Sequence, residues 1–422
     1  MSKFLTVVVV GTLAFLVGCG GGSGTPKGVP TGGNGTNVQP IAVDGGPVPN
    51  VIYPDGAFTS VTVCQTGTTT CQTIDGILVD TGSFGLRILA SALTITLPAL
   101  QSGNSTLYNC IQFADTSFLW GTVSVADVQM AGELASQASI QVIEDPAPNT
   151  FTIPANCSNG GINEDTQAFL GTNGILGVGP EPEDCGPGCD PNFDNGVAPE
   201  PFYYLCSSGT ACTPASVTSL ASVPLGQPNQ QVVNPVAMFA TDSNGVIVQL
   251  PALSGAAATE TGSLIFGIGT QANNQVPSSA KIFALDPSIG DTFTTTYKGQ
   301  VLTGSFIDSG SNGLFFPDAT IPACVDIPDF FCPASILSLS ALNTETTSVT
   351  GATSTVNFSI DNADNLFAGG GGADAAYSTL GGPNTGGPFD FGLPFFYGRS
   401  VFTAIDGAAV PSNTPTAPWV AY

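Results

Sequence analysis

Two similar acidic stretches constrain this chain more than any other feature of its sequence. Residues 76–83 read Gly-Ile-Leu-Val-Asp-Thr-Gly-Ser, and residues 304–311 read Gly-Ser-Phe-Ile-Asp-Ser-Gly-Ser. Each is an apolar strand that ends in an aspartate, Asp80 or Asp308, followed by a hydroxyl residue, a glycine and a serine. The two aspartates are 228 positions apart (308 − 80), which is more than a typical domain length of about 100–200 residues. The repetition predicts two related lobes that bring two carboxylates together.

The composition favours an all-β fold around these stretches. The 422 residues include 53 glycines and 33 prolines, and together with many Thr, Ser and Val residues this mixture is typical of short strands joined by turns. The length predicts two or three domains with sizeable cores. No long amphipathic helix with capping signals stands out.

The charged residues narrow the possible functions. The chain has 6 Lys and Arg against 31 Asp and Glu, a net charge of −25, and such a polyanion repels nucleic acid, so we expect no nucleic-acid partner. Histidine is absent, which excludes His-activated nucleophiles and His metal ligands and leaves carboxylates as the acid–base groups. We therefore expect no metal and no cofactor. Solubility is an alternative explanation of the negative charge.

The N-terminal segment predicts export and lipid attachment. Lys3 precedes an apolar run over residues 4–17, which is too short to span a membrane and suits a signal peptide. Residues 16–19 read Leu-Val-Gly-Cys and resemble the bacterial lipobox, which implies acylation of Cys19 after removal of a signal peptide at residues 1–18. Residues 19–45 then form a flexible tether. Because Gly20 and not Asp follows the cysteine, we expect a cell-envelope protein anchored by lipid, in the outer membrane rather than the inner one. An ordinary signal peptide with a coincidental cysteine is the alternative.

The remaining ten cysteines predict disulfides, because an exported chain with an even number of cysteines commonly pairs them. The irregular cysteine spacing and the absence of histidine disfavour a zinc site. Connectivity does not follow from sequence alone. Proximity in the sequence favours Cys64–Cys71, Cys185–Cys189, Cys206–Cys212 and Cys324–Cys332, which leaves Cys110–Cys157.

Further segments resemble the pepsin-like aspartic peptidases from about residue 51 to the C-terminus. Residues 173–180 contain Asn-Gly-Ile-Leu-Gly, close to a strand that passes beside the first aspartate loop in that family, and Gly392 is the second-lobe counterpart of Gly177. Residues 110–132 match the flap hairpin, with Phe113 at the position of the family's flap tyrosine. Arg87 lies near the place of a family tryptophan. An uncharacterised bacterial lipoprotein family with the same ground plan is a closer possible match.

The resemblance implies an all-β, bilobal fold of two barrel-like lobes with a cleft between them. The N-terminal lobe would span residues 46–235, with a disulfide-rich insertion at 181–232, and the C-terminal lobe residues 236–422. It also implies that Asp80 and Asp308 are the catalytic pair. The supporting residues would be Thr81 and Ser309, which bond across the lobes, Ser83 and Ser311, which bond the outer carboxylate oxygens, and Gly82 and Gly310, which permit close approach.

Two carboxylates held together share one proton, because both cannot ionise cheaply at short range. One then serves as base towards a bound water and the other as acid towards a peptide carbonyl. The sequence therefore predicts an aspartic endopeptidase with a peptide or protein substrate in the inter-lobe cleft. A non-catalytic binding or inhibitor-like module on the same fold is the main alternative, and a structural envelope lipoprotein is a third.

Overall fold

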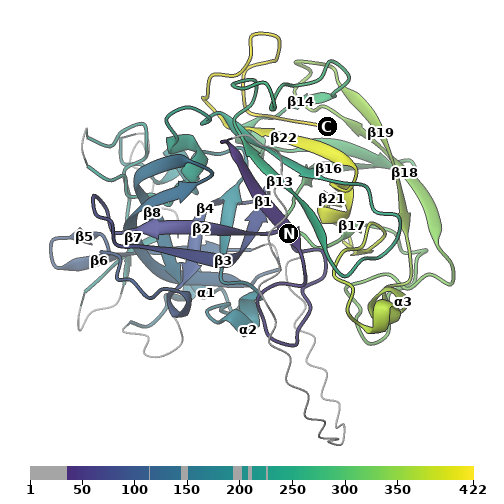
Figure 1. Ribbon diagram of the computed structural model, residues 1–422, viewed down its shortest axis with the longest axis horizontal. Helices are drawn as coiled ribbons and strands as arrows, with labels where there is room; N and C mark the ends of the chain where they lie inside the picture. The colour runs from purple at the N-terminus through teal and green to yellow at the C-terminus, as the bar shows by residue number, and fades with distance from the viewer. Residues whose placement is uncertain (1–35, 114, 144–150, 193–201, 208–211, 225–226) are drawn as a thin grey trace, which may run out of the picture.

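The computed structural model describes residues 36–422 except 114, 144–150, 193–201, 208–211 and 225–226. The described chain is built from two β-sheets, and its longest helix, α3 (Ala363–Ala368), has six residues. Figure 1 shows two lobes side by side, the N-terminal half in purple and blue and the C-terminal half in green and yellow. The predicted all-β, bilobal fold class is confirmed.

The N-terminal lobe is one continuous, strongly curved part of the larger sheet. Strand β3 lies between β2 and β9 in this sheet, and β4 lies between β9 and β8, so the first aspartate loop is enclosed by strands on both sides. The strands are β2 (Phe58–Cys64), β3 (Cys71–Asp80), β4 (Phe84–Leu89), β5 (Gln101–Ser102), β6 (Ser105–Gln112), β7 (Phe118–Met130), β8 (Glu133–Ile143), β9 (Gly174–Val178), β10 (Tyr203–Cys206) and β11 (Thr213–Pro214).

A central group of strands joins the two lobes. Strand β1 pairs with β13 over its whole length and with β2 at one position, so the larger sheet passes from the N-terminal lobe towards the C-terminal one. In Figure 1 β1 and β13 lie between the two halves. The group consists of β1 (Val38–Val43), β12 (Gly245–Leu250), β13 (Glu260–Phe266), β14 (Ile282–Ala284), β22 (Arg399–Ala404) and β23 (Trp419–Ala421).

The C-terminal lobe has its own seven-stranded sheet, in the order β19-β18-β15-β16-β21-β17-β20. Its core is rich in phenylalanine, and the rings of Phe316 and Phe389 stack with centroids 4.9 Å apart. The strands are β15 (Phe293–Tyr297), β16 (Gln300–Ile307), β17 (Leu314–Phe316), β18 (Leu337–Thr344), β19 (Thr353–Ile360), β20 (Gly381–Pro383) and β21 (Asp390–Phe391). The remaining helices of the described chain are short: α1 (Ala155–Ser158), α2 (Gln167–Leu170), η1 (Ala90–Ala92), η2 (Gly186–Cys189), η3 (Pro235–Met238), η4 (Pro287–Ile289), η5 (Gly369–Gly371) and η6 (Leu393–Phe395).

The tether prediction for residues 19–45 is wrong at its C-terminal end. Residues 38–43 form β1, and Ile41 and Val43 are buried in the core shared by the lobes. The reason is the alternation Val-Gln-Pro-Ile-Ala-Val, which suits a strand with one buried face. Residues 19–35 of the predicted tether lie outside the described residues. The predicted lobe boundary between residues 235 and 236 falls within η3 and stays a prediction.

The local architecture around the two aspartates repeats in both lobes. In the N-terminal lobe β3 runs parallel to β9, which is antiparallel to β4. In the C-terminal lobe β16 runs parallel to β21, which is antiparallel to β17. A Cβ atom on Gly177 would lie 2.6 Å from the backbone of Phe84, and one on Gly392 would lie 2.1 Å from a backbone oxygen of the second loop. Gly177 and Gly392 are therefore counterparts, as the sequence predicted, because each lets a strand pass close to an aspartate loop.

The four disulfides predicted from sequence proximity are confirmed, and so is the remaining pair, Cys110–Cys157. Cys110–Cys157 connects β6 to α1 and closes the longest loop, with a sequence separation of 47 residues. The others close local loops of four to eight residues: Cys64–Cys71, Cys185–Cys189, Cys206–Cys212 and Cys324–Cys332.

Candidate functional site

The two aspartates meet where the lobes touch. Asp80 is the last residue of β3, and Asp308 directly follows β16. Both side chains are fully buried. The strands that carry them end in apolar residues, and buried Ile77, Leu78 and Val79 in β3 and Ile307 in β16 anchor each aspartate in its own lobe. The opposed ends of two buried strands thus bring the two carboxyl groups to the interface.

One backbone group contacts both carboxylates. The N–H of Gly82 lies 2.9 Å from Asp80 Oδ1 and 3.1 Å from Asp308 Oδ1. The two Oδ1 atoms are therefore no more than 6.0 Å apart, the sum of these distances. A Cβ atom at position 82 would lie 2.4 Å from Cγ of Asp308, so only glycine fits between the two acids. The structure brings the predicted pair together, and its catalytic role stays a prediction.

Thr81 and Ser309 cross-link the two loops by reciprocal hydrogen bonds. Thr81 Oγ1 accepts from the N–H of Ser309 at 2.9 Å and donates to the carbonyl of Ile307 at 3.3 Å. In the mirror arrangement, Ser309 Oγ accepts from the N–H of Thr81 at 3.1 Å and donates to the carbonyl of Val79 at 2.8 Å. All four bonds cross from one lobe to the other. They fix the distance between the strands that carry the acids.

The serines of the two loops bind the outer carboxylate oxygens. Ser83 Oγ donates to Asp80 Oδ2, and Ser311 Oγ lies 2.8 Å from Asp308 Oδ2. On the inner side, the N–H of Gly310 donates to Asp308 Oδ1 at 2.8 Å, as that of Gly82 does to Asp80. Each loop therefore surrounds its own carboxylate with the same donors, an arrangement that stabilises negative charge on the pair.

An open pocket of about 350 Å³ lies directly beside this pair. Thr81 and Gly82 form its inner wall, and Gln112 at the end of β6 approaches from the N-terminal lobe. Its other lining residues come from both lobes and are mostly apolar; they include Phe84, Pro180, Leu285, Phe293, Phe306, Ile307 and Val420. Asp291 adds an acidic group to the lining. The pocket can hold an apolar group next to the two carboxylates.

Phe113, predicted as the flap residue, follows β6 at the tip of the β6–β7 hairpin. Its N–H donates to the carbonyl of Ser117 at 2.8 Å, so the predicted hairpin is present. Its ring packs among Leu119, Ile175 and further apolar side chains of the N-terminal lobe and is 6% exposed. The flap role stays a prediction. Residue 114, the adjacent flap position, lies outside the described residues.

Sequence reasoning missed two polar residues at the site. Tyr53 is buried, and burial, followed by the negative charges of Glu164, Asp80 and Asp308, raises the pKa of its phenol well above the usual value. Asp390 in β21 lies 2.7 Å from the hydroxyl of Ser311. Neither residue belongs to an aspartate motif. A signal for Asp390 was available in the sequence: it stands two positions before Gly392, where the matching position before Gly177 holds the apolar Ile175.

Arg87 has a structural position in the N-terminal lobe. Its buried guanidinium forms an ion pair with Asp184 at 2.9 Å and donates to Asn109 and Gln141 at 2.6 and 2.7 Å. Asp184 belongs to the predicted insertion at 181–232, and Tyr203 from β10 also donates to it. Burial raises the pKa of the Asp184 carboxyl, while the charge of Arg87 opposes that shift. The network fastens the described part of the insertion to the lobe.

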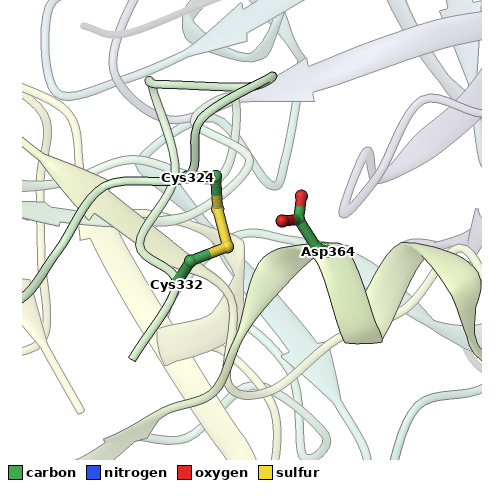
Figure 2. Close-up of side chains that lie close together, drawn as sticks. All are labelled: Cys324, Cys332 and Asp364. Carbon is green, nitrogen blue, oxygen red and sulfur yellow. A yellow bond between two sulfur atoms is a disulfide. The ribbon is translucent and has the colours of Figure 1, made fainter. Parts of the chain in front are cut away.

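One side-chain cluster has the composition of a metal site. Figure 2 shows Cys324, Cys332 and Asp364 close together, and their candidate ligand atoms lie within 4.8 Å of one another. Both sulfurs belong to a disulfide, so neither is available as a thiolate ligand. This cluster does not fit a metal ion.

Membrane attachment through Cys19 cannot be followed in the structure, because residue 19 lies outside the described residues. Within the described ranges, no helix is long and apolar enough to cross a membrane.

The comparisons with known proteins found a similar solved structure and a matching family. An aspartic proteinase from Irpex lacteus has a similar structure, with 15% sequence identity, a TM-score of 0.49 and coverage of 91% of this chain and 96% of that chain. No curated protein matches. Residues 33–422 match the family described as "Protein of unknown function (DUF3443)", and the chain belongs to that family.

Proposed function

We propose that this protein is an aspartic endopeptidase in which Asp80 and Asp308 activate a water molecule for attack on a peptide bond. The observation that carries the proposal is the single N–H of Gly82 within hydrogen-bonding distance of both carboxylates. Carboxyl groups held this close share a proton, which provides a base and an acid at the same place.

The chemistry divides between the two carboxyl groups. The ionised member takes a proton from a water molecule held between them, and the resulting hydroxide equivalent attacks the carbonyl carbon of the substrate. The protonated member gives its proton to the carbonyl oxygen, and the tetrahedral intermediate then breaks the C–N bond as the amine takes up a proton. The pair titrates as one unit. The reciprocal bonds of Thr81 and Ser309 keep the carboxylates in register during this exchange.

The pocket beside Gly82 supports a peptide substrate. Its apolar lining from both lobes suits the side chain of an apolar residue next to the scissile bond. Because Thr81 and Gly82, which follow Asp80 in the first loop, line the pocket, a side chain in it would hold the neighbouring peptide bond near the carboxylates.

We also propose that the protein acts in the bacterial cell envelope, attached through an acylated Cys19, with outer-membrane sorting. The support is the basic start, apolar run and Leu-Val-Gly-Cys sequence of residues 3–19. The Gly-rich residues that follow provide a linker between such an anchor and the first strand.

A non-catalytic binding module on the same fold is the second candidate. It is favoured by the complete burial of both aspartates, since catalysis requires a water molecule and a substrate to reach them. The two candidates differ in one measurable property, the ability to cleave a denatured protein.

The deciding experiment is digestion of a denatured protein from about pH 3 to pH 7, with and without pepstatin. We expect pepstatin-sensitive cleavage by the wild type and a loss of about 100-fold or more in Asp80→Asn and Asp308→Asn, because each variant keeps the shape and removes an acid–base group. Asp55→Asn is the matched control: Asp55 is also fully buried, but it accepts its hydrogen bonds from Tyr377 N and Tyr397 Oη and not from the two aspartate loops. Full activity of Asp308→Asn, or no cleavage by the wild type at any of these pH values, would refute the peptidase function and favour the binding module.

A further inference from the structure

A third buried aspartate is part of the same hydrogen-bonded group. Asp390 begins β21, which lies between β16 and β17 in the C-terminal sheet (Figure 1). It is opposite Phe306 on β16 and Phe315 on β17, and its side chain is 1% exposed. A carboxyl group in such an apolar place is costly when ionised.

Ser311 connects Asp390 to the proposed catalytic pair. Its buried hydroxyl oxygen lies 2.8 Å from Asp308 Oδ2 and 2.7 Å from Asp390 Oδ2. A serine hydroxyl has one hydrogen and can donate to only one of these oxygens. Both contacts are hydrogen bonds only if one of the two carboxyl groups is protonated and donates to Ser311. The geometry therefore requires a proton on Asp308 or on Asp390.

The surrounding donors favour the proton on Asp390. Asp308 accepts two backbone N–H groups at Oδ1, from Gly82 and Gly310, and such bonds stabilise its ionised form. A charge on Asp390 would add a third like charge behind the pair, which raises the free energy of the ionised state further.

The described elements that flank Asp390 bring one titratable side chain, that of Asp308, towards it. The neighbouring elements β16, β17 and η6 contain no titratable side chain, and the loop at residues 308–313 contributes only Asp308. Asp80 lies beyond it, on the other side of the Gly82 N–H.

In the N-terminal lobe, the position equivalent to Asp390 is apolar. Val79 and Ile307, the residues before the two aspartates, are opposite Leu176 and Phe391. The counterpart of Asp390 is therefore Ile175, which is apolar. Each loop offers its own carboxylate the same kinds of donor. Asp390 is therefore a feature of the C-terminal lobe alone at this position, and through Ser311 it affects Asp308 and not Asp80.

We infer that Asp390 is a neutral carboxylic acid that donates to Ser311, and that Ser311 in turn donates to Asp308. In this role Asp390 is a positioning residue: it holds Asp308 as the ionised member of the pair and directs the shared proton to Asp80. The effect of Asp390 on catalysis rests on the proposed peptidase function. The protonation of Asp390 does not depend on that function.

The pH dependence of kcat/KM tests the inference. Asp390→Asn keeps an N–H donor to Ser311, so its activity and the position of the acid limb should stay within about twofold of the wild type. Asp390→Leu is close in shape but has no donor, and the weakened bond from Ser311 should move the acid limb to higher pH by about one unit. An ionised Asp390 predicts the opposite sign, a shift to lower pH in both variants. That result, or an unchanged profile in Asp390→Leu, overturns the inference.

Infrared difference spectroscopy gives a readout that does not need activity. Subtracting the Asp390→Asn spectrum from that of the wild type near pH 6 should reveal the carbonyl band of one protonated carboxylic acid. Asp318→Asn is the control, because hydrogen bonds from Lys298 and Thr320 outweigh burial and lower the pKa of Asp318 to about 2, so only carboxylate bands should be lost. A missing band in the Asp390 comparison overturns the inference even in an active enzyme. An inactive wild type that shows the band refutes the peptidase function alone.

Discussion

Glu183 allows a direct test of how burial of carboxyl groups couples the stability of this fold to pH. Its side chain is 5% exposed, and Oε2 accepts hydrogen bonds from Leu220 N at 2.9 Å and Asn229 Nδ2 at 3.4 Å. Burial raises the pKa of Glu183 from 4.5 to about 7, and the charges of Asp184 and Asp190 add to the shift while the two hydrogen bonds oppose it. The folded protein therefore favours the neutral acid.

The sign and size of the effect follow from linkage. A raised folded-state pKa contributes stability that is fully present below about pH 4.5 and is lost as the pH rises through about 7. A shift of this size corresponds to about 3.5 kcal/mol at about 1.4 kcal/mol per unit, as an upper value. Glu183→Gln keeps an oxygen acceptor for Leu220 and Asn229 and never ionises. The variant should therefore gain about 2–3 kcal/mol relative to the wild type between pH 4 and pH 8.

The assay is urea unfolding of both proteins, with disulfides intact, at about pH 4 and pH 8. The pH dependence of the difference is decisive, because any packing cost of the glutamine amide is the same at both pH values. Glu345→Gln is a control of opposite sign. Burial acts to raise the pKa of Glu345, but hydrogen bonds from Thr350, Thr347 and Gly351 outweigh it and lower the pKa, so this variant should lose stability relative to the wild type as the pH rises. A difference between Glu183→Gln and wild type that does not change with pH would refute the reasoning.

Three further predictions concern the loops, the anchor and the thiols. Thr81→Ala should lower the free energy of unfolding, measured by thermal unfolding, by about 2–3 kcal/mol, because it leaves the buried N–H of Ser309 without its acceptor. Thr81→Ser keeps the hydroxyl and should lower it by less than about 1 kcal/mol. Equal losses in the two variants would contradict a role of the hydroxyl. Cys19→Ser should move the protein from the membrane to the soluble fraction, and a membrane-bound variant would argue against lipid attachment there. Thiol titration of the mature, denatured protein without reductant should find no reactive thiol, since the other ten cysteines are paired; two or more thiols would contradict this.

The parts of the site that the sequence predicted are those in which the chemistry is local. Each aspartate loop carries its glycine, serine and hydroxyl residue within three positions, so the repeated motif and its resemblance to the pepsin-like peptidases were enough to name the groups that surround each carboxylate. The disulfides were predictable for the same reason, since four of the five close loops of four to eight residues. Cys110–Cys157 followed only because no other partner remained.

The parts that escaped prediction depend on contacts across the fold. Asp390 reaches the site through its register beside β16, and the surrounding sequence, Phe-Asp-Phe-Gly, shows no acid–base motif. Tyr53 precedes β2, far from either motif in the sequence, and burial followed by the charges of Glu164, Asp80 and Asp308 raises the pKa of its phenol. Strand β1 was assigned to the tether because it follows a Gly-rich segment, although pairing with β13 stabilises it. In each case the partner lies on a different strand, and sequence spacing does not reveal it.

The charge composition and the buried carboxyl groups favour the same range of pH. Burial raises the pKa values of Asp55, Glu183 and Asp291, so each of these groups stabilises the fold when protonated and costs stability as the pH rises. With 6 basic residues against 31 acidic ones, full protonation of the acids removes the net charge of −25 and leaves only a small positive one. Acid therefore relieves self-repulsion here, whereas it creates repulsion in a protein rich in lysine and arginine. A pair of aspartates that shares a proton works only below the pH at which both ionise, and in that range the buried acids with raised pKa values also contribute most to stability.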